Sequence, residues 1–406
     1  MKRIYLDHAA TTPVDPEVVK EMLPYFSEVF GNPSSPHALG QEARRAVERA
    51  RAEIASFLGA SPDEIVFTGG GAESNNFALK GIARSLSARG KHVITTSIEH
   101  HSVLEAARSL EQEGFEVTYL PVDAHGLVDP LDVRKSLRSD TILISVMHAN
   151  NEIGTIQHIP EIGSIAREAG VFFHTDAVQT FGHIPTRVDE LHVALLSASA
   201  HKLYGPKGVG ILYVREGTPI SPLIHGGDQE RHRRGSTLNV PGIVGMATAV
   251  RIARETMDQE GARLAALRQI LAEGILARIE RSRLNGHPTR RVPNNVSVSI
   301  EGIEGMSALI DLDAQGITCS TGAACTTSSV KPSHVLTALG LSEDLARGSL
   351  RFSLGRSTSE EDIHRVLDVL PRIVERVRAL SPSYRAGRSF ETFLYPGWDR
   401  AEVERL

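Results

Sequence analysis

The chain has 406 residues, more than a single hydrophobic core usually supports, so we expect two domains. Hydrophobic residues make up 41% of it and charged residues 23%, a composition that fits a globular protein and excludes a disordered one. The net charge of −5 and the absence of an apolar run near the roughly 20 residues of a membrane helix predict neither a nucleic-acid nor a membrane partner.

The small number of cysteines indicates the redox compartment of the protein. Only two occur, Cys319 and Cys325, whereas a secreted disulfide scaffold uses more. The opening basic residues are followed by Asp7 and His8 rather than by the apolar stretch of a signal peptide. We therefore expect a reducing, cytoplasmic location.

Seven runs rich in β-branched residues predict strands at 64–68, 92–96, 116–120, 142–146, 171–175, 193–197 and 210–214. Helical patterns such as 99–113 and 160–169 separate several of them. This alternation predicts an α/β domain with a mostly parallel, seven-stranded sheet. Ligands of such sheets bind at the carboxyl ends of the strands, so the residues after each run are the candidates for a site.

A second, smaller α+β domain is expected after this sheet. Its elements are a helix over 240–281, strands at 294–300 and 349–354, and a helix over 359–380. We place the large domain at 14–255 and the small one at 256–406 together with 1–13. The tail 381–406 contains several prolines and glycines and suggests no function.

A glycine-rich turn, Gly69–Gly71, separates the first strand from a helix expected to start near Glu73. Glycines let backbone N–H groups approach an anion, and a helix N-terminus favours negative charge. The pattern lacks the GK[ST] of a P-loop, so a phosphate cradle and an ordinary tight turn are about equally supported by this turn alone.

Two further residues follow predicted strands. Asp176 could pair with the protonated ring nitrogen of an electron-sink cofactor, and it could also cap a helix beginning near Ala177, since both roles are compatible. Lys202 could hold pyridoxal phosphate (PLP) as an imine. Lys207 is the weaker candidate, because Pro206 and Gly208 predict an exposed turn around it.

The cysteines differ in their surroundings. Cys325 lies in a run of small and hydroxyl residues, 319–329, where an exposed thiol suits a nucleophile. Cys319 follows apolar residues and is expected to be buried. His100 and His101 point in opposite directions on an extended chain, and no CxxC or HxxxH pattern occurs, so no metal is expected.

Together these segments resemble class V aminotransferase-like PLP enzymes, and within them the NifS/IscS-type cysteine desulfurases. The match runs from residue 4 to about 356 through IYLDHAATTPVDP, FGNPSSPH, EIVFTGGGAESNN, EHHSVLE, HANNEIGTIQ, HTDAVQT, AHKLYGPKGVG, GDQERHRRGSTLNV, STGAACTTSSVKPSHVLTALG and RFSLGR. The resemblance implies PLP fold type I, PLP as cofactor, and conversion of L-cysteine to L-alanine with a persulfide on Cys325.

The resemblance also implies a role for each matching residue. Lys202 would hold the cofactor and act as the base, and His100 would stack on the ring and shuttle protons. The other cofactor contacts it implies are Gly71, Ala72, Asn151, Asp176, Gln179, Ser199, His201 and Thr237. Asn151 and Arg351 would bind the substrate carboxylate. Thr237, with the basic Arg233 and Arg234, would complete the phosphate site of a second subunit in a homodimer.

Two positions depart from the family pattern. Ala72 replaces a hydroxyl residue, which removes a phosphate hydrogen bond of roughly 0.5–1.5 kcal/mol. Ala200 replaces a glycine, which is tolerable where its backbone φ is negative. The tail does not match the IscS pattern beyond residue 382, so docking of an iron–sulfur scaffold or other sulfur acceptor, such as a tRNA-thiolation carrier, is not determined by the sequence.

Two alternatives stay open at this point. A transaminase or lyase of the same fold would use Lys202 and Asp176 but leave Cys325 unexplained. A non-catalytic relative is supported by Ala72 and opposed by the other matching residues. Whether selenocysteine is also a substrate is likewise open.

Overall fold

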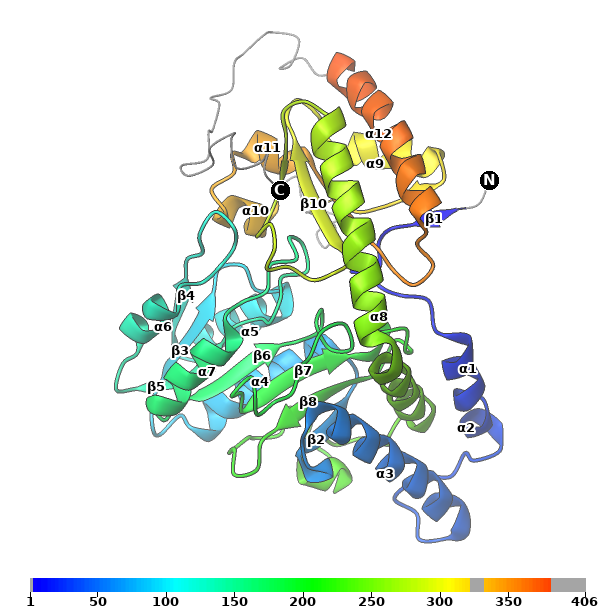
Figure 1. The fold of residues 1–406 in the computed structure, drawn as a ribbon. Coiled ribbons are helices and arrows are strands. Elements are labelled where there is room, and N and C mark those ends of the chain that lie inside the picture. Colours follow the sequence, from blue (N-terminus) through cyan, green and yellow to red (C-terminus); the bar gives the residue numbers. More distant parts are fainter. Residues whose placement is uncertain (1–2, 322–331, 381–406) are drawn as a thin grey trace.

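The structure, a computed structural model, describes residues 3–321 and 332–380 (Figure 1). The predicted nucleophile Cys325 and the tail 381–406 lie outside the described residues. Within the described ranges, no helix combines the length and the apolar character needed to cross a membrane.

A seven-stranded sheet forms the centre of the larger part of the molecule, in the order β2-β8-β7-β6-β5-β3-β4. β8 is antiparallel to both of its neighbours and the other neighbouring pairs are parallel, so the predicted mostly parallel sheet is confirmed. The strands are β2 (Ile65–Thr68), β3 (His92–Thr96), β4 (Glu116–Leu120), β5 (Thr141–Ser145), β6 (Phe172–Asp176), β7 (Leu195–Ser199) and β8 (Gly210–Val214).

Helices cover both faces of this sheet, because alternate strand residues point to opposite faces. On β2, Ile65 and Phe67 join one apolar cluster with α3, α6, α7 and α8, while Val66 joins another with α4 and α5. The helices are α3 (Ala38–Leu58), α4 (Gly71–Ser85), α5 (His101–Gln112), α6 (Pro130–Ser136), α7 (Ile159–Glu168) and α8 (Val240–Arg278).

The 21-residue helix α3 illustrates how the local sequence sets these elements. Its buried side chains recur every three or four residues and form one apolar stripe; they include Ala43, Val47, Ala50, Ile54 and Leu58. The helix ends at Gly59, whose φ of 72° is a left-handed conformation that glycine adopts without strain. Before α3, α1 (Pro16–Met22) and α2 (Pro24–Ser27) lie along one flank.

A smaller part surrounds the far half of α8 and has its own apolar cluster. That cluster includes Ile4 and Leu6 because β1 pairs in parallel with β11. The N-terminal segment therefore packs with C-terminal residues, although the exact domain limits stay a prediction. The elements are β1 (Ile4–Tyr5), β9 (Ser282–Leu284), β10 (Asn295–Ile300), α9 (Gly305–Ala314), β11 (Ile317–Thr318), α10 (His334–Ala338), α11 (Glu343–Arg347), β12 (Ser349–Ser353) and α12 (Glu360–Leu380).

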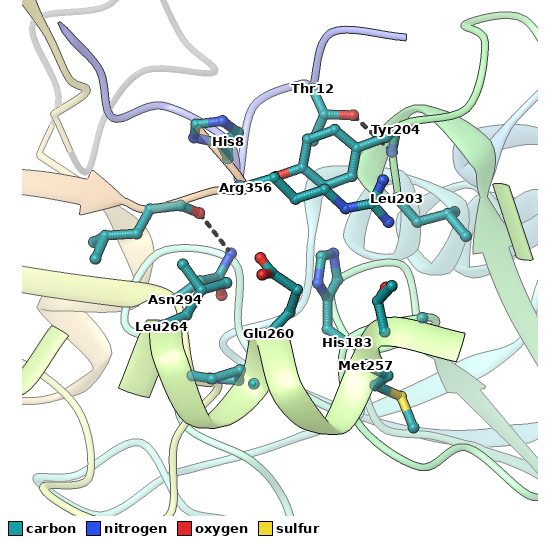
Figure 2. Close-up of a pocket in the computed structure, with 15 residues that line it drawn as sticks. His8, Thr12, His183, Leu203, Tyr204, Met257, Glu260, Leu264, Asn294 and Arg356 are labelled. Carbon is teal, nitrogen blue, oxygen red and sulfur yellow. Dashed lines mark hydrogen bonds between the residues drawn. The ribbon is translucent and has the colours of Figure 1, made fainter. Parts of the chain in front are cut away.

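Arg356 joins the two parts beside a small pocket (Figure 2). Its guanidinium donates to Asp15 at 2.8 Å and lies 4.2 Å from the centroid of the Tyr204 ring. Its backbone N–H donates to the Tyr204 hydroxyl at 2.7 Å. Because Asp15 precedes α1 and Arg356 follows β12, these contacts hold the end of the small-domain sheet against the large part.

The predicted element limits differ from the observed ones by a few residues. The predicted strand 193–197 is Leu195–Ser199, because its ladder with β8 continues to Ser199. The long helix ends at Arg278, three residues early, because Ile279 is extended and Arg281 has a φ of 56°. Backbone hydrogen bonds set where these elements end, and the residue composition of a segment does not predict those bonds.

Candidate active site

The candidate residues meet because their strands end at one edge of the sheet. Gly69–Gly71 follow β2, Asp176 ends β6 and Ser199 ends β7. Asp176 is paired in register with Ser197, and a Cβ on Gly71 would lie 3.6 Å from the Cβ of Ser199. The structure thus gathers the candidate phosphate turn, carboxylate and lysine at one place.

Asp176 is buried and held by two donors. Asn75 Nδ2 donates to its Oδ2 at 2.7 Å, and the Val178 backbone N–H donates to its Oδ1 at 2.9 Å. The residues that follow form a turn rather than a helix, so the helix-cap interpretation is wrong. Each carboxylate oxygen thus accepts one hydrogen bond from the protein, and the side chain is a candidate partner for a protonated ring nitrogen.

Lys202 closes the 3₁₀ turn Ala200–Lys202 that follows β7. Its Nζ donates to the carbonyl oxygens of Ala9 and Ala10, each at 2.6 Å, and Gln179 Nε2 donates to the Ala9 carbonyl at 3.1 Å. The N-terminal segment therefore lies directly against the lysine and Gln179. These acceptors are neutral carbonyls, which hold the amine without the charge of a carboxylate.

A hydrogen-bonded chain connects His100 to Asp176. Asn75 Nδ2 also donates to Ser102 Oγ at 2.8 Å, and Ser102 Oγ lies 2.8 Å from His100 Nδ1. Burial lowers the pKa of His100, Lys202 lowers it further, and Asp176 opposes both. His100 is consequently a neutral ring near Lys202 and Asp176.

Asn75 and Ser102 are functional candidates that the sequence reasoning missed. Both lie inside matching motifs, GGGAESNN and EHHSVLE, which was the signal available for them. Asn75 Oδ1 is buried and has no hydrogen-bond partner among the described residues.

The Gly-rich turn has the geometry of an anion cradle. Gly70 has a φ of 148° and caps α4 without any side-chain bond. A Cβ on Gly71 would meet Val178 Cγ2 at 2.8 Å, so the turn admits no larger residue there without a shift. Because the first N–H groups of α4 lack intrahelical partners, this end of the helix favours a phosphate.

His201 and the two departures from the family pattern surround this cradle. His201 Nδ1 lies 3.1 Å from Thr11 Oγ1, and burial together with Lys202 lowers its pKa to about 4, so the ring is neutral. Ala72 is exposed in the first turn of α4. Ala200 is buried and is not among the residues with positive φ, so its methyl group is accommodated.

Arg351 and Asn151 also come together. Arg351 is buried on β12, and its Nη1 donates to the Asn151 carbonyl at 3.1 Å while Nη2 donates to Asp7 at 2.9 Å. Its Nε is buried and has no partner among the described residues. Asp7 was missed by the sequence reasoning, because a residue 344 positions away cannot be paired from spacing.

Thr237 stands apart from the other candidates. It is exposed on the loop before α8, and no hydrogen bond joins its side chain to another described candidate of the same chain. Cys319 is 6% exposed, and burial raises the pKa of its thiol to about 12, so its predicted packing role is confirmed.

Over 3–321 and 332–380, no group of three His, Cys, Asp or Glu residues is arranged to hold a metal.

Comparison with known proteins shows what this chain is similar to. The family profile described as Aminotransferase class-V matches residues 4–366. A cysteine desulfurase IscS of Dictyoglomus turgidum is 56% identical over 94% of this chain and 97% of the relative. A solved NifS-like protein is 41% identical with a TM-score of 0.87 over 92% of this chain and all of that one. A structure described as SspA in complex with cysteine is also 41% identical, with a TM-score of 0.78 over 86% and 98% of the two chains.

Glu99, immediately before His100, is fully buried and was also missed. Its Oε1 accepts from Thr96 Oγ1 at 2.8 Å and from the Met147 N–H at 2.9 Å. Burial raises its pKa from 4.5 to about 8, with a small further rise from Asp176 that the two hydrogen bonds oppose. Glu99 is therefore a neutral acid at pH 7.

Replacing this buried acid should change how stability depends on pH. The folded protein holds the Glu99 proton up to pH of about 8 and the unfolded chain releases it near 4.5, so the free energy of unfolding falls as pH rises between these values. Glu99→Gln should flatten this fall and be more stable than the wild type above pH 8. Denaturant unfolding from pH 5 to 9 measures it, with exposed Glu105→Gln as control. Equal pH slopes in the wild type and Glu99→Gln would contradict the assignment.

Proposed function

The chain belongs to the class-V aminotransferase family and, within it, to the cysteine desulfurases, which use PLP, and from this premise we propose how its own residues perform the reaction. The substrate is L-cysteine, the products are L-alanine and a persulfide on Cys325, and the sulfur supplies iron–sulfur cluster assembly or tRNA thiolation. The convergence of Lys202, Asp176 and the Gly-rich turn carries this proposal.

The residues of the site fit PLP. Gly71 with Ser199 and the neutral ring of His201 would hold the phosphate at the N-terminus of α4. Asp176 would bind the ring nitrogen and Gln179 would lie near the ring hydroxyl. When bound, the cofactor accepts the electrons released at the substrate α-carbon.

Proton transfer falls to Lys202 and His100. Lys202 would be the base for the α-proton, because its amine lies at the same end of the sheet as Asp176 and the Gly-rich turn. His100 is neutral, so it can stack on the ring and exchange a proton without adding positive charge beside Lys202. The chain through Ser102 and Asn75 fixes the orientation of His100 relative to Asp176.

Arg351 and Asn151 would hold the substrate carboxylate. The Arg351 Nε has no partner among the described residues, whereas Nη2 already pairs with Asp7. A guanidinium can bind a carboxylate through a pair of parallel hydrogen bonds, so an incoming carboxylate would compete with Asp7 for this fork. The guanidinium would select substrates that carry an α-carboxylate.

Cys325 then accepts the sulfur and passes it to an acceptor protein. The other thiol cannot substitute for it, since Cys319 is buried and its pKa is about 12. This pair of thiols is the feature that favours a desulfurase over a transaminase of the same fold. Thiol chemistry of this kind fits the reducing cytoplasm.

A second copy of the chain would complete the site. Thr237 is exposed, and no hydrogen bond joins it to a candidate residue within the described part of its own subunit, as expected for a residue that serves the partner's phosphate site. Large apolar side chains are also exposed from α1 to the first turn of α3, namely Val19, Leu23, Phe26, Phe30 and Leu39. Such exposure on a monomer marks an interaction surface, so we propose a homodimer.

Lys202 is the residue on which cofactor attachment depends. Lys202→Ala should lose the visible absorbance of the lysine-bound cofactor, while Lys207→Ala should keep it because Lys207 is exposed on a turn. Borohydride reduction followed by peptide mass spectrometry locates the attachment. Cofactor trapped on Lys207 would contradict the assignment.

Cys325→Ser should separate cofactor chemistry from sulfur transfer. The variant should bind PLP and cysteine with an unchanged spectrum, yet carry no persulfide and lose nearly all sulfide release, since no other reactive thiol is present. Cys319→Ser is the matched control and should retain most activity. Mass spectrometry after brief exposure to cysteine detects the added sulfur, and sulfur on Cys319 would overturn the assignment.

Mixing inactive variants tests the shared site. Lys202→Ala and Thr237→Ala subunits, mixed equally and allowed to exchange, should restore about one quarter of the sites, because a mixed dimer contains one intact site. Lys202→Ala mixed with Asp176→Asn should restore none, since both residues belong to the same subunit's site. Sulfide release measures recovery, and a fully active monomer in sedimentation would refute the dimer.

A further inference from the structure

The basic loop that ends at Thr237 is held in a strained conformation. Glu230, Arg231 and His232 have successive φ values of 48°, 56° and 64°, and Ser236 has a φ of 104°. Non-glycine residues in this region cost on the order of 1–3 kcal/mol each, and they persist where surrounding contacts impose them. The contacts that hold the loop in this shape must therefore offset the backbone strain.

A buried ion pair supplies one of these contacts. Glu230 is fully buried, and its carboxylate accepts from Arg51 at 2.6 and 2.9 Å and from the Phe67 backbone N–H at 2.7 Å. Arg51 also donates to the Ile65 carbonyl at 2.7 Å. The loop is thus fixed to β2, the strand that leads directly into the Gly-rich turn.

A second ion pair reaches the turn itself. Arg234 Nε and Nη2 donate to the two carboxylate oxygens of Glu73 at 2.9 and 3.3 Å. Glu73 Oε2 in turn accepts from the Gly69 backbone N–H at 2.7 Å. Arg234 therefore acts on the first glycine of the proposed phosphate turn through one intermediate side chain.

The negative charge of Glu73 connects the Arg234–Glu73 pair to the proposed phosphate site. Glu73 is a carboxylate in the first turn of α4, the same helix end that is proposed to receive the phosphate of PLP. Two anions at one helix end repel each other, and a guanidinium paired with the carboxylate offsets that repulsion. Ala72 provides no hydroxyl here, so the turn relies more on its remaining contacts.

We propose that Arg234 is a positioning residue for the cofactor phosphate: it neutralises Glu73, sets the Gly69–Gly71 turn of its own subunit, and links that turn to the loop that carries Thr237 to the partner. This inference rests on the proposed PLP site. Arg234 pairs with Glu73 of its own subunit, so it would act on the cofactor phosphate through Glu73 and the turn.

The test compares PLP with pyridoxal, which lacks the phosphate, by titrating the apo forms of the dimeric enzyme. Arg234→Gln should weaken PLP binding about tenfold, because it leaves the Glu73 charge beside the phosphate, and should change pyridoxal binding less than about twofold. The double variant Glu73→Gln/Arg234→Gln should recover most of the PLP affinity, since the repelling charge is gone.

Arg84→Gln is the matched control. It removes the same charge from another arginine–glutamate pair at the opposite end of α4, where Arg84 Nη2 donates to Glu113 at 3.0 Å. Its PLP affinity should stay within about twofold of the wild type. Sedimentation and circular dichroism confirm that each variant is a folded dimer, and the double variant keeps the test valid if Arg234→Gln is unstable.

Three outcomes would overturn the proposal. They are unchanged PLP affinity in Arg234→Gln, an equal loss for PLP and pyridoxal, or no recovery in the double variant. The underlying site is tested separately by Ser199→Ala, which leaves Glu73 and Arg234 in place. If the wild type bound PLP no better than pyridoxal and Ser199→Ala changed nothing, the phosphate site itself would be wrong, and this inference would fail with it.

Discussion

The carboxyl ends of parallel strands can meet only at one edge of a sheet, and the whole site depends on this constraint. β2, β6 and β7 deliver the Gly-rich turn, Asp176 and Ser199 to that edge although they are far apart in the sequence. β8 is inserted antiparallel between β2 and β7, so β2 keeps the direction of the other strands and its turn faces the same side. One reversed strand thus leaves the site intact.

The N-terminal segment is the second constraint. Its first strand pairs with β11 of the smaller part, while the carbonyl oxygens of Ala9 and Ala10 accept from Lys202 of the larger part. Asp7, between these contacts, pairs with Arg351. The same short segment therefore contacts the proposed cofactor lysine and the proposed substrate arginine, and it sets their relation across the two parts.

Burial, more than charge pairing, sets the protonation of the site. His100 and His201 have lowered pKa values and Glu99 a raised one, and burial is the largest cause in each case. All three are neutral at pH 7 as a result. Asp176, Lys202 and Arg351 are the groups proposed to bind the ring, the cofactor aldehyde and the substrate carboxylate.

The sequence by itself determined the alternating strands and helices, the preference for Lys202 over Lys207, and the burial of Cys319, because each depends on neighbours within a few residues. Resemblance extended this to a family and to roles at matching positions. Only the tertiary structure joined Asn75 with Asp176, Asp7 with Arg351, and Arg51 with Glu230, pairs separated by 101, 344 and 179 residues. Such pairs arise from how the elements pack, and no local pattern of residues records which buried donor will face which distant acceptor.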